Sequence, residues 1–405
     1  MNRVNCPIPL AETQIEMIGD NRSLRRVPAQ VVLNLSPIPR VIIDITTHLV
    51  SLVHLNIPNT VGGLLKIRTP SGAEIEVSIS EWSINGRYRA RLVPTQHQQP
   101  VTAIQTGDKL QSVKFNVVNF PEFHCKLSTG DQTYTVRLQT PTWRIEIKAV
   151  PEISAVKRRL EEESGYGITH EGSIRRSDGE LFSVEEVEKL LDGLHLFLSF
   201  ARGAYCGITL ISGNDKNGDK VWEQWGTYPT YPWFTMVSWF DVWKGETLSE
   251  VFRGFWKRFE EESDDDPVRV ALYWYLISNE SDSLEARIVL TQAALERLAY
   301  TIVGKRKKSC KTGIWIGNAL KKKKIDPKIP LSCQALEKFR REEGLCDGPH
   351  TLTEIRNHLI HPKQTRNIRV DDYSEAWDVG QRYVELLLLN LFEYNGPYIN
   401  RLARK

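Results

Sequence analysis

The chain has 405 residues, of which 41% are hydrophobic and 25% are charged. This is the normal balance of a globular protein with two or three domains, and it excludes wholesale disorder, a collagen-like chain and a disulfide miniprotein. The net charge is only +3, but residues 281–405 carry 23 lysines and arginines against 15 acidic residues, which indicates that the C-terminal part meets an anion.

The expected compartment follows from what the sequence lacks. No apolar run approaches the roughly 18 residues that a membrane span needs, and the N-terminal residues lack the apolar stretch of a signal peptide. The six cysteines are scattered without a CxxC pair, which argues against a zinc site and a disulfide framework. We therefore expect a cytoplasmic protein that has reduced thiols, holds no metal or cofactor and does not enter a membrane.

Residues 1–150 contain short segments that are β-branched or alternate between apolar and polar residues, and Pro, Gly and Asn separate them. Seven such strands predict a sandwich or a barrel-like β domain over residues 1–165. The predicted strands are Val31–Leu35, Val41–Ile45, Leu65–Ile67, Glu74–Ile79, Val113–Val118, Tyr134–Leu138 and Trp143–Ile147.

Residues 166–265 are expected to form a mixed α/β, tryptophan-rich region that packs on the first domain. Ser183 and Glu186 form a capping-box pattern before an apolar repeat of helical spacing. His195 lies inside this predicted helix, where we interpret it as a packing or exposed residue, not a catalytic one. Residues 222–243 contain nine aromatic side chains, which could stack bases, but we favour core packing.

From Asp266 onward the pattern is helical. Asp266 followed by Pro267 is typical of a helix start, with an N-cap and then a proline at the first helical position. We expect residues 266–405 to form an all-α bundle of four or five helices, so that the whole chain is α+β with a β-rich N-terminal region. Further helices are predicted from Asp282 to Gly304, near Gln334–Arg341, from Thr351 to Pro362 and over about Asp371–Tyr394.

The segment Glu354–Pro362 is the most informative, because Arg356 and His361 stand in it with four residues between them. At about 100° per residue, one side of the expected helix is its core face. That face is formed by Leu352, Ile355 and Leu359, and His358 lies near its edge. The arc that points away from the core carries Arg356, Asn357, Ile360 and His361. Three polar residues with one isoleucine on such an arc are typical of a site at a protein interface.

An arginine and a histidine at this spacing, on a capped helix of an all-helical region, resemble the Arg-x(4–6)-His signature of the HEPN superfamily (higher eukaryotes and prokaryotes nucleotide-binding). Asn357 fits the members in which a polar residue follows the arginine. The resemblance covers about residues 281–400. It implies a metal-independent endoribonuclease with Arg356, Asn357 and His361 as catalytic residues, and a homodimer in which two protomers share one composite site.

Glu296 resembles an acidic position that is often found in these bundles. It is expected to support Arg356 through an ion pair, and an ordinary surface ion pair remains the alternative. His358 is the second supporting residue of the predicted site. The chemistry suits RNA cleavage by attack of the 2′-hydroxyl on the adjacent phosphorus. A histidine can move protons at neutral pH, and an arginine can stabilise charge on the pentavalent phosphate.

A basic segment before the motif supports a polyanionic partner. Nine cations within twenty residues carry no acidic residue among them, so we expect RNA to be attracted electrostatically. The alternative is an exposed loop that only aids solubility, and Trp315 inside the segment could stack a base or anchor that loop. The nine are Lys305, Arg306, Lys307, Lys308, Lys311, Lys321, Lys322, Lys323 and Lys324.

The longer layout, a β-rich region before a HEPN-like bundle, resembles bacterial ApeA-type abortive-infection proteins. The resemblance implies antiviral defence or a toxin function, with an N-terminal region that senses or regulates through a phage or regulatory ligand. Two alternative functions remain open. One is a HEPN module that binds RNA, nucleotides or proteins without catalysis, and the other is a structural adaptor that uses residues 222–243 for protein contacts.

Overall fold

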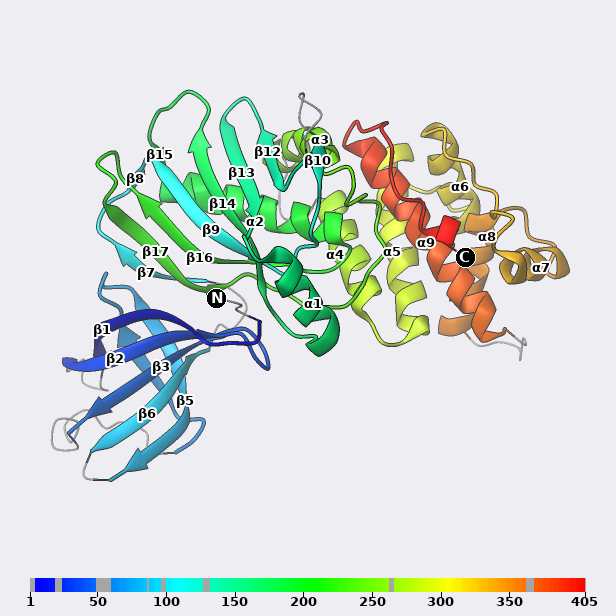
Figure 1. The fold of residues 1–405 in the computed structure, drawn as a ribbon. Helices are drawn as coiled ribbons and strands as arrows, with labels where there is room; N and C mark the ends of the chain where they lie inside the picture. Colours follow the sequence, from blue (N-terminus) through cyan, green and yellow to red (C-terminus); the bar gives the residue numbers. More distant parts are fainter. Residues whose placement is uncertain are drawn as a thin grey trace. The chain divides into compact units, whose positions relative to one another are not determined.

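The computed structural model describes residues 4–18, 24–48, 60–85, 87–95, 100–126, 132–261, 266–361 and 368–404. The fold is α+β, with a strand-rich N-terminal part and a helical C-terminal part, as the sequence predicts (Figure 1). The chain forms two compact units. The β-rich unit comprises Met1–His195 and Cys206–Thr235, and the helical unit comprises Leu196–Tyr205 and Met236–Lys405.

A closed barrel of six antiparallel strands forms the first part of the β-rich unit (Figure 1). Neighbouring strands follow the order β1-β2-β3-β6-β5-β4, and β4 pairs with β1 to close the barrel. Alternate residues such as Ile15, Ile43 and Val77 are buried in its apolar interior, because successive side chains of a strand point to opposite faces. The strands are β1 (Ile8–Ile18), β2 (Leu24–Asn34), β3 (Arg40–Thr47), β4 (Leu64–Arg68), β5 (Glu74–Ile84) and β6 (Tyr88–Pro94).

A sheet of seven antiparallel strands forms the rest of the unit, in the order β12-β13-β14-β9-β16-β17-β7. In β9, β13 and much of β14, buried apolar residues alternate with more exposed polar ones, so one face of the sheet is a core face and the other faces solvent. The strands are β7 (Val101–Gln105), β9 (Ser112–Val118), β12 (Thr135–Gln139), β13 (Trp143–Ala149), β14 (Ile168–Arg176), β16 (Gly207–Asn214) and β17 (Lys220–Thr227).

Smaller elements complete the β-rich unit. Helix α1 (Ile153–Glu163), which was not predicted from the sequence, packs against β14. Two short strand pairs are β8 (Lys109–Leu110) with β15 (Phe182–Ser183), and β10 (Cys125–Lys126) with β11 (Gln132–Thr133). Helix α2 (Val184–Arg202) begins in this unit, and the boundary between the two units falls inside it.

The predicted capping box of α2 is confirmed. The Ser183 N–H donates to the Glu186 carboxylate at 2.7 Å, and the Glu186 N–H donates to the Ser183 hydroxyl at 3.2 Å. The packing interpretation of His195 is also confirmed. Its Nε2 donates to the Pro229 carbonyl at 2.8 Å, and burial lowers the pKa of this imidazole to about 4.

The tryptophan-rich segment is mainly a core segment, as favoured above. Trp222, Trp225 and Trp239 are at most 1% exposed, so they are not available to stack bases. Trp243 differs, because 63% of it is exposed. The aromatic side chains of this segment therefore act chiefly through apolar burial, which large aromatic residues supply most effectively.

The helical unit continues with seven helices and a short 3₁₀ helix in the described residues. These are α3 (Thr247–Glu261), α4 (Pro267–Glu280), α5 (Leu284–Val303), α6 (Thr312–Lys322), α7 (Gln334–Glu342), α8 (Gly348–Ile360), α9 (Val370–Leu391) and η2 (Arg401–Arg404). The predicted start at Asp266 is confirmed, because its carboxylate accepts from the N–H groups of Val268 and Arg269 at 2.9 and 3.0 Å. Nowhere in the described part of the chain is a helix long and apolar enough to cross a membrane.

Several helix predictions need correction. The described residues from 266 onward contain six α-helices, not four or five, because α6 occupies part of the predicted basic loop. Helix α5 is capped by Ser283 instead of Asp282. Helix α8 begins after Asp347 instead of at Thr351, because the Asp347 carboxylate accepts from the His350 N–H at 3.0 Å. Pro362, the predicted end of that helix, lies outside the described residues.

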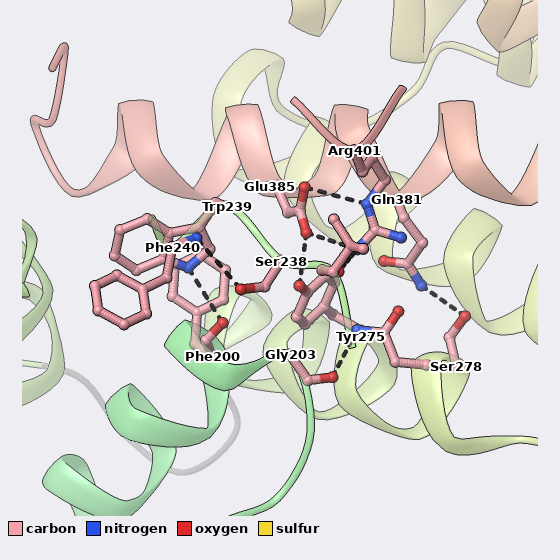
Figure 2. Close-up of polar contacts among 12 residues, drawn as sticks. Phe200, Gly203, Ser238, Trp239, Phe240, Tyr275, Ser278, Gln381, Glu385 and Arg401 are labelled. Carbon is pink, nitrogen blue, oxygen red and sulfur yellow. Dashed lines mark hydrogen bonds and ion pairs between the residues drawn. The ribbon is translucent and has the colours of Figure 1, made fainter. Parts of the chain in front are cut away.

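Polar side chains link segments in the interior of the helical unit (Figure 2). Glu385 on α9 accepts a hydrogen bond from the Tyr275 hydroxyl at 2.7 Å. Arg401 on η2 donates to both oxygens of the same carboxylate, at 2.7 and 3.3 Å. Only 3% of each charged side chain is exposed, so this ion pair joins α4, α9 and the C-terminal segment away from solvent.

Candidate functional site

Helix α8 presents the predicted motif at its C-terminal end. Leu352 and Ile355 are buried, as the helical wheel predicts, whereas Arg356 and Asn357 are half-buried. The helix ends at His361, whose backbone N–H donates to the Asn357 carbonyl at 2.8 Å. The predicted orientation of the arc is confirmed where it is most exposed, because Ile360 is 43% exposed and His361 is exposed as well.

Arg356 is held by two neighbours. Its Nη2 donates to the Glu296 carboxylate on α5 at 3.2 Å, and its Nη1 donates to the Asn357 side-chain oxygen at 3.2 Å. The predicted pairing of Arg356 with Glu296 is therefore present. The Arg356 and Glu296 side chains are 25% and 33% exposed, and the Arg356 Nε is buried without a hydrogen-bond partner. The guanidinium is therefore partly accessible to solvent, but its unpartnered Nε faces the interior.

Two residues that were not predicted from the sequence orient the Arg356–Glu296 pair. Gln292, one turn before Glu296 on α5, donates to Glu296 at 3.3 Å and to the Thr353 hydroxyl at 3.1 Å. Thr353 lies one turn before Arg356 on α8, and its hydroxyl donates to the Pro349 carbonyl at 2.8 Å. The spacing of four between Gln292 and Glu296 is the only sequence signal for this support, because the link to Thr353 depends on how the helices pack.

His361 stands apart from the other predicted catalytic groups. Among the described residues, no hydrogen bond or ion pair joins its imidazole to Arg356, Asn357 or Glu296. It lies five positions after Arg356, with four residues between them, which corresponds to an axial rise of about 7.5 Å. The supporting residue His358 is half-buried on the same turn. One protomer therefore holds an arginine–asparagine–glutamate group and, one turn further on, an exposed imidazole.

The basic segment is two groups instead of one loop. Lys305, Arg306, Lys307, Lys308 and Lys311 are exposed between α5 and α6, whereas Lys321 and Lys322 lie in the last turn of α6 and Lys323 and Lys324 follow it. Trp315 anchors the segment, because its ring N–H donates to the Gly304 carbonyl at 3.1 Å. The Lys322 ammonium donates to the Ile302 carbonyl at 2.6 Å near the end of α5.

Helices α5 and α8 contact each other at the site through two pairs of side chains. Gln292 contacts Thr353, and Glu296, one turn later on α5, contacts Arg356. Helix α6 joins the neighbouring parts of both helices, because Trp315 donates to the Gly304 carbonyl after α5, and Gly313 packs against His350 near the start of α8.

Comparisons with known proteins place the chain in a family. Residues 105–236 match the model of the YopA central domain, and residues 261–405 match the model of the YopA C-terminal domain. The SPbeta prophage-derived uncharacterized protein YopA of Bacillus subtilis (strain 168) is 30% identical over 309 residues, which cover 73% of this chain and 69% of that protein. No solved structure matches the chain. The chain therefore belongs to the YopA family.

Proposed function

We propose that the helical unit is a HEPN-like, metal-independent endoribonuclease whose catalytic groups are Arg356, Asn357 and His361. The observation that carries the proposal is the partly exposed Arg356 guanidinium, which Glu296 and Asn357 orient near the end of the helix that exposes His361. This arrangement offers a phosphate a partly exposed guanidinium fork beside an exposed imidazole, the side chain that most often acts as a general acid or base.

The reaction uses the RNA's own nucleophile. The 2′-oxygen forms a bond to the adjacent phosphorus while the bond from phosphorus to the 5′-oxygen breaks, which leaves a cyclic phosphate and a free 5′-hydroxyl. One imidazole takes the 2′-hydroxyl proton, and a second proton is delivered to the departing 5′-oxygen. Arg356 stabilises the negative charge that develops on the phosphoryl oxygens, and Asn357 orients the phosphate.

A homodimer would supply both proton-transfer groups. Each protomer has one His361, so two facing α8 helices would bring an acid and a base to one phosphate. Ile360, which is 43% exposed between the motif residues, would then lie in the contact between the protomers. The exposed cations after α5 and at the end of α6 would hold the RNA backbone on either side.

The biological setting is part of the same proposal. A cytoplasmic RNA-cleaving protein whose activity is controlled by its β-rich unit would act in antiviral defence or as a toxin. The relative named above is prophage-derived, which supports a role in conflict that involves phages. The β-rich unit would receive the phage or regulatory signal that releases cleavage.

A non-catalytic HEPN-like module that binds RNA or nucleotides is the second candidate. It is favoured by the ion pair that already engages Arg356 and by the lack of a contact between Arg356 and His361 among the described residues. In that case Arg356 and the lysines would bind phosphate, and His361 would have no chemical task.

The test is cleavage of a fluorescently labelled RNA by the purified full chain, with and without EDTA. We expect EDTA-resistant cleavage that falls about 100-fold or more in His361→Ala and in Arg356→Ala. The control is His358→Ala, an imidazole on the same turn, which should retain most activity. Equal cleavage by wild type and His361→Ala would remove the ribonuclease assignment, and RNA binding without any cleavage would establish the second candidate.

A further inference from the structure

The solvent face of the seven-stranded sheet carries a grid of polar residues at its centre. Strands β13, β14 and β9 are neighbours there (Figure 1), and their register places six side chains in two rows on that face. One row is Lys148, Glu171 and Asn116, and the other is Glu146, Ser173 and Lys114. The two lysines stand at opposite corners of the grid, and the two carboxylates lie between them.

This grid lines a hollow with a volume of about 420 Å³. Such a volume lies within the range of roughly 300–1,000 Å³ that is usual for small-molecule sites. Most small-molecule sites are predominantly apolar, whereas the lining here includes four charged side chains, an amide and a hydroxyl. The hollow therefore suits a ligand that is itself polar and charged.

A like-charge pair borders the hollow. Arg144 on β13 stands directly opposite Arg175 on β14, two residues along each strand from Glu146 and Ser173, and therefore on the same face. Both arginines are exposed, and within the described parts of the chain neither forms an ion pair. Like charges directly opposite each other destabilise a sheet. Lys114 is diagonal to Arg175, so three cations gather at this end.

Elsewhere in the β-rich unit, the residue directly opposite an arginine on the neighbouring strand is often a carboxylate, which neutralises the arginine's charge. Glu16 stands opposite Arg26 and binds it at 3.0 Å, and Arg91 stands opposite Asp44 and binds it at 2.9 Å. Arg137, on the strand beside the grid, stands opposite Glu146 and binds it at 2.9 Å. The Arg144–Arg175 pair departs from this pattern at the rim of the hollow, where an external anion can reach both guanidinium groups.

We propose that this sheet face is a binding site for a phosphate-bearing ligand of nucleotide size. Arg144, Arg175 and Lys114 would bind the phosphates, because guanidinium forks hold phosphate oxygens through paired hydrogen bonds. The carboxylates of Glu146 and Glu171 would accept hydrogen bonds from hydroxyl or amino groups of the remainder. Both ends of such a ligand therefore find complementary groups in one hollow.

A small ligand fits the site better than an RNA strand. Proteins that hold single strands without sequence preference combine basic grooves with exposed aromatic platforms for the bases. Phe115 is the aromatic side chain among those that line the hollow, and it is 1% exposed. The site would give a ligand class to the regulatory role of the β-rich unit, and that regulatory meaning rests on the proposed function, whereas binding itself does not.

Calorimetric titration of the full chain with ATP, and separately with sodium tripolyphosphate and adenosine, tests the proposal. We expect ATP to bind more tightly than either of the other two, because it occupies both the cationic rim and the carboxylate centre. The double variant Arg144→Gln/Arg175→Gln should bind ATP at least tenfold more weakly. The matched control is Lys66→Gln/Arg89→Gln, which removes two exposed cations from the barrel strands of the same unit and should bind within twofold of wild type.

Each other outcome overturns the proposal. If ATP binds no more tightly than tripolyphosphate, the carboxylates of Glu146 and Glu171 do not contact the ligand. If both double variants lose ATP affinity equally, the effect is due to net charge and not to this site. Titration of ATP, GTP, CTP and UTP without saturation at millimolar concentration would remove the site altogether. The His361→Ala protein should bind ATP as wild type does, so the ligand site and the ribonuclease assignment can fail independently.

Discussion

Two of the arginine–glutamate pairs in the helical unit differ greatly in burial, although the sequence does not distinguish them. Arg401 binds Glu385 through two contacts, the shorter of 2.7 Å, and only 3% of each side chain is exposed. Arg356 binds Glu296 through one contact of 3.2 Å, with 25% and 33% of the side chains exposed. The first pair lies in the interior that Figure 2 shows, and the second joins α5 to α8, the helix that His361 caps.

The difference in burial decides what each arginine can do. Around Arg401 the chain supplies the partners: Nη2 also donates to the Val237 carbonyl at 3.1 Å, and the Glu385 carboxylate also accepts from Tyr275. Burial and the nearby Glu385 charge raise the pKa of Tyr275 well above its usual value, so its hydroxyl remains a donor. The Arg356 side chain is 25% exposed, so solvent reaches its surface pair. We therefore expect the first pair to stabilise the fold and the second to be able to exchange its glutamate partner for a phosphate.

The largest effect is expected from breaking the interior pair. Arg401→Met should lower the free energy of unfolding by about 3–5 kcal/mol, because it leaves the Glu385 carboxylate buried without its counter-charge. The double variant Arg401→Met/Glu385→Met should recover much of that loss. Urea denaturation measures both. The control is Lys257→Met, whose partner Glu393 is 70% exposed and whose loss should cost about 1 kcal/mol or less.

A loss below 1 kcal/mol in Arg401→Met would mean that burial does not separate the two pairs, and the comparison would fail. A double variant that is as unstable as the single one would show that the segment needs the polar contacts themselves. In that case the hydrogen bonds to Val237 and Tyr275, not the removal of an isolated charge, would carry the stability.

The surface pair should show the opposite balance. Arg356→Lys keeps the positive charge but replaces the planar fork, so it should change stability by about 1 kcal/mol or less while cleavage falls about 100-fold. Thermal melting and the RNA cleavage assay are read on the same preparation. A variant that cleaves at the wild-type rate would show that only the charge of Arg356 matters, and one that is strongly destabilised would make it a structural residue.

Formation of the proposed homodimer is expected to depend on the C-terminal end of α8. Ile360→Asp should weaken the homodimer at least tenfold and reduce cleavage in proportion, because a composite site needs both chains. Sedimentation at several protein concentrations measures the dimer. Val370→Asp changes another β-branched aliphatic residue, which is 70% exposed at the start of α9, and provides a control for added surface charge. A wild-type monomer that cleaves at full rate would exclude the shared site.

The sequence predicts a structural feature well when the residues that form it are close together in the chain. Caps are local, so Ser183, Glu186 and Asp266 identify helix starts correctly. Helix α6 was missed because its lysines and glycines resemble a loop. Gly313 instead serves packing: a Cβ at this position would lie 2.5 Å from the Cα of His350 on α8. Such a requirement arises only once the two helices meet.

The candidate site divides in the same way. Arg356, Asn357 and His361 could be proposed from the sequence because they stand within six residues at the end of one helix, and the Glu296 pairing was proposed from a resemblance. Gln292 contributes through Thr353 on another helix, which no spacing within one segment reveals. The Arg144–Arg175 opposition depends on strand register, which comes from the fold and not from either strand alone.

A smaller effect is expected from the cations that flank the surface pair. Lys321→Gln/Lys324→Gln should weaken RNA binding and reduce the slope of log K against log salt by about 1.4, since each phosphate contact to a single strand contributes about 0.7. Lys322 is left intact because it bonds the end of α5. Lys244→Gln/Arg253→Gln removes two exposed cations in another segment of the unit and should leave the slope unchanged. An equal slope in the wild type and both double variants would show that Lys321 and Lys324 do not contact RNA and only aid solubility.

The smallest effect is expected at Glu296, and it separates orientation from charge at the surface pair. Glu296→Gln retains an oxygen that can accept from Arg356, so cleavage should change by less than about threefold. Glu296→Ala removes that acceptor and lets the guanidinium turn away, so cleavage should fall about tenfold while stability changes by about 1 kcal/mol or less. If the glutamine and alanine variants behave alike, the ion pair is an ordinary surface contact. If glutamine raises the RNA affinity without changing the rate, Glu296 competes with phosphate for Arg356, as a pair with an exchangeable partner should.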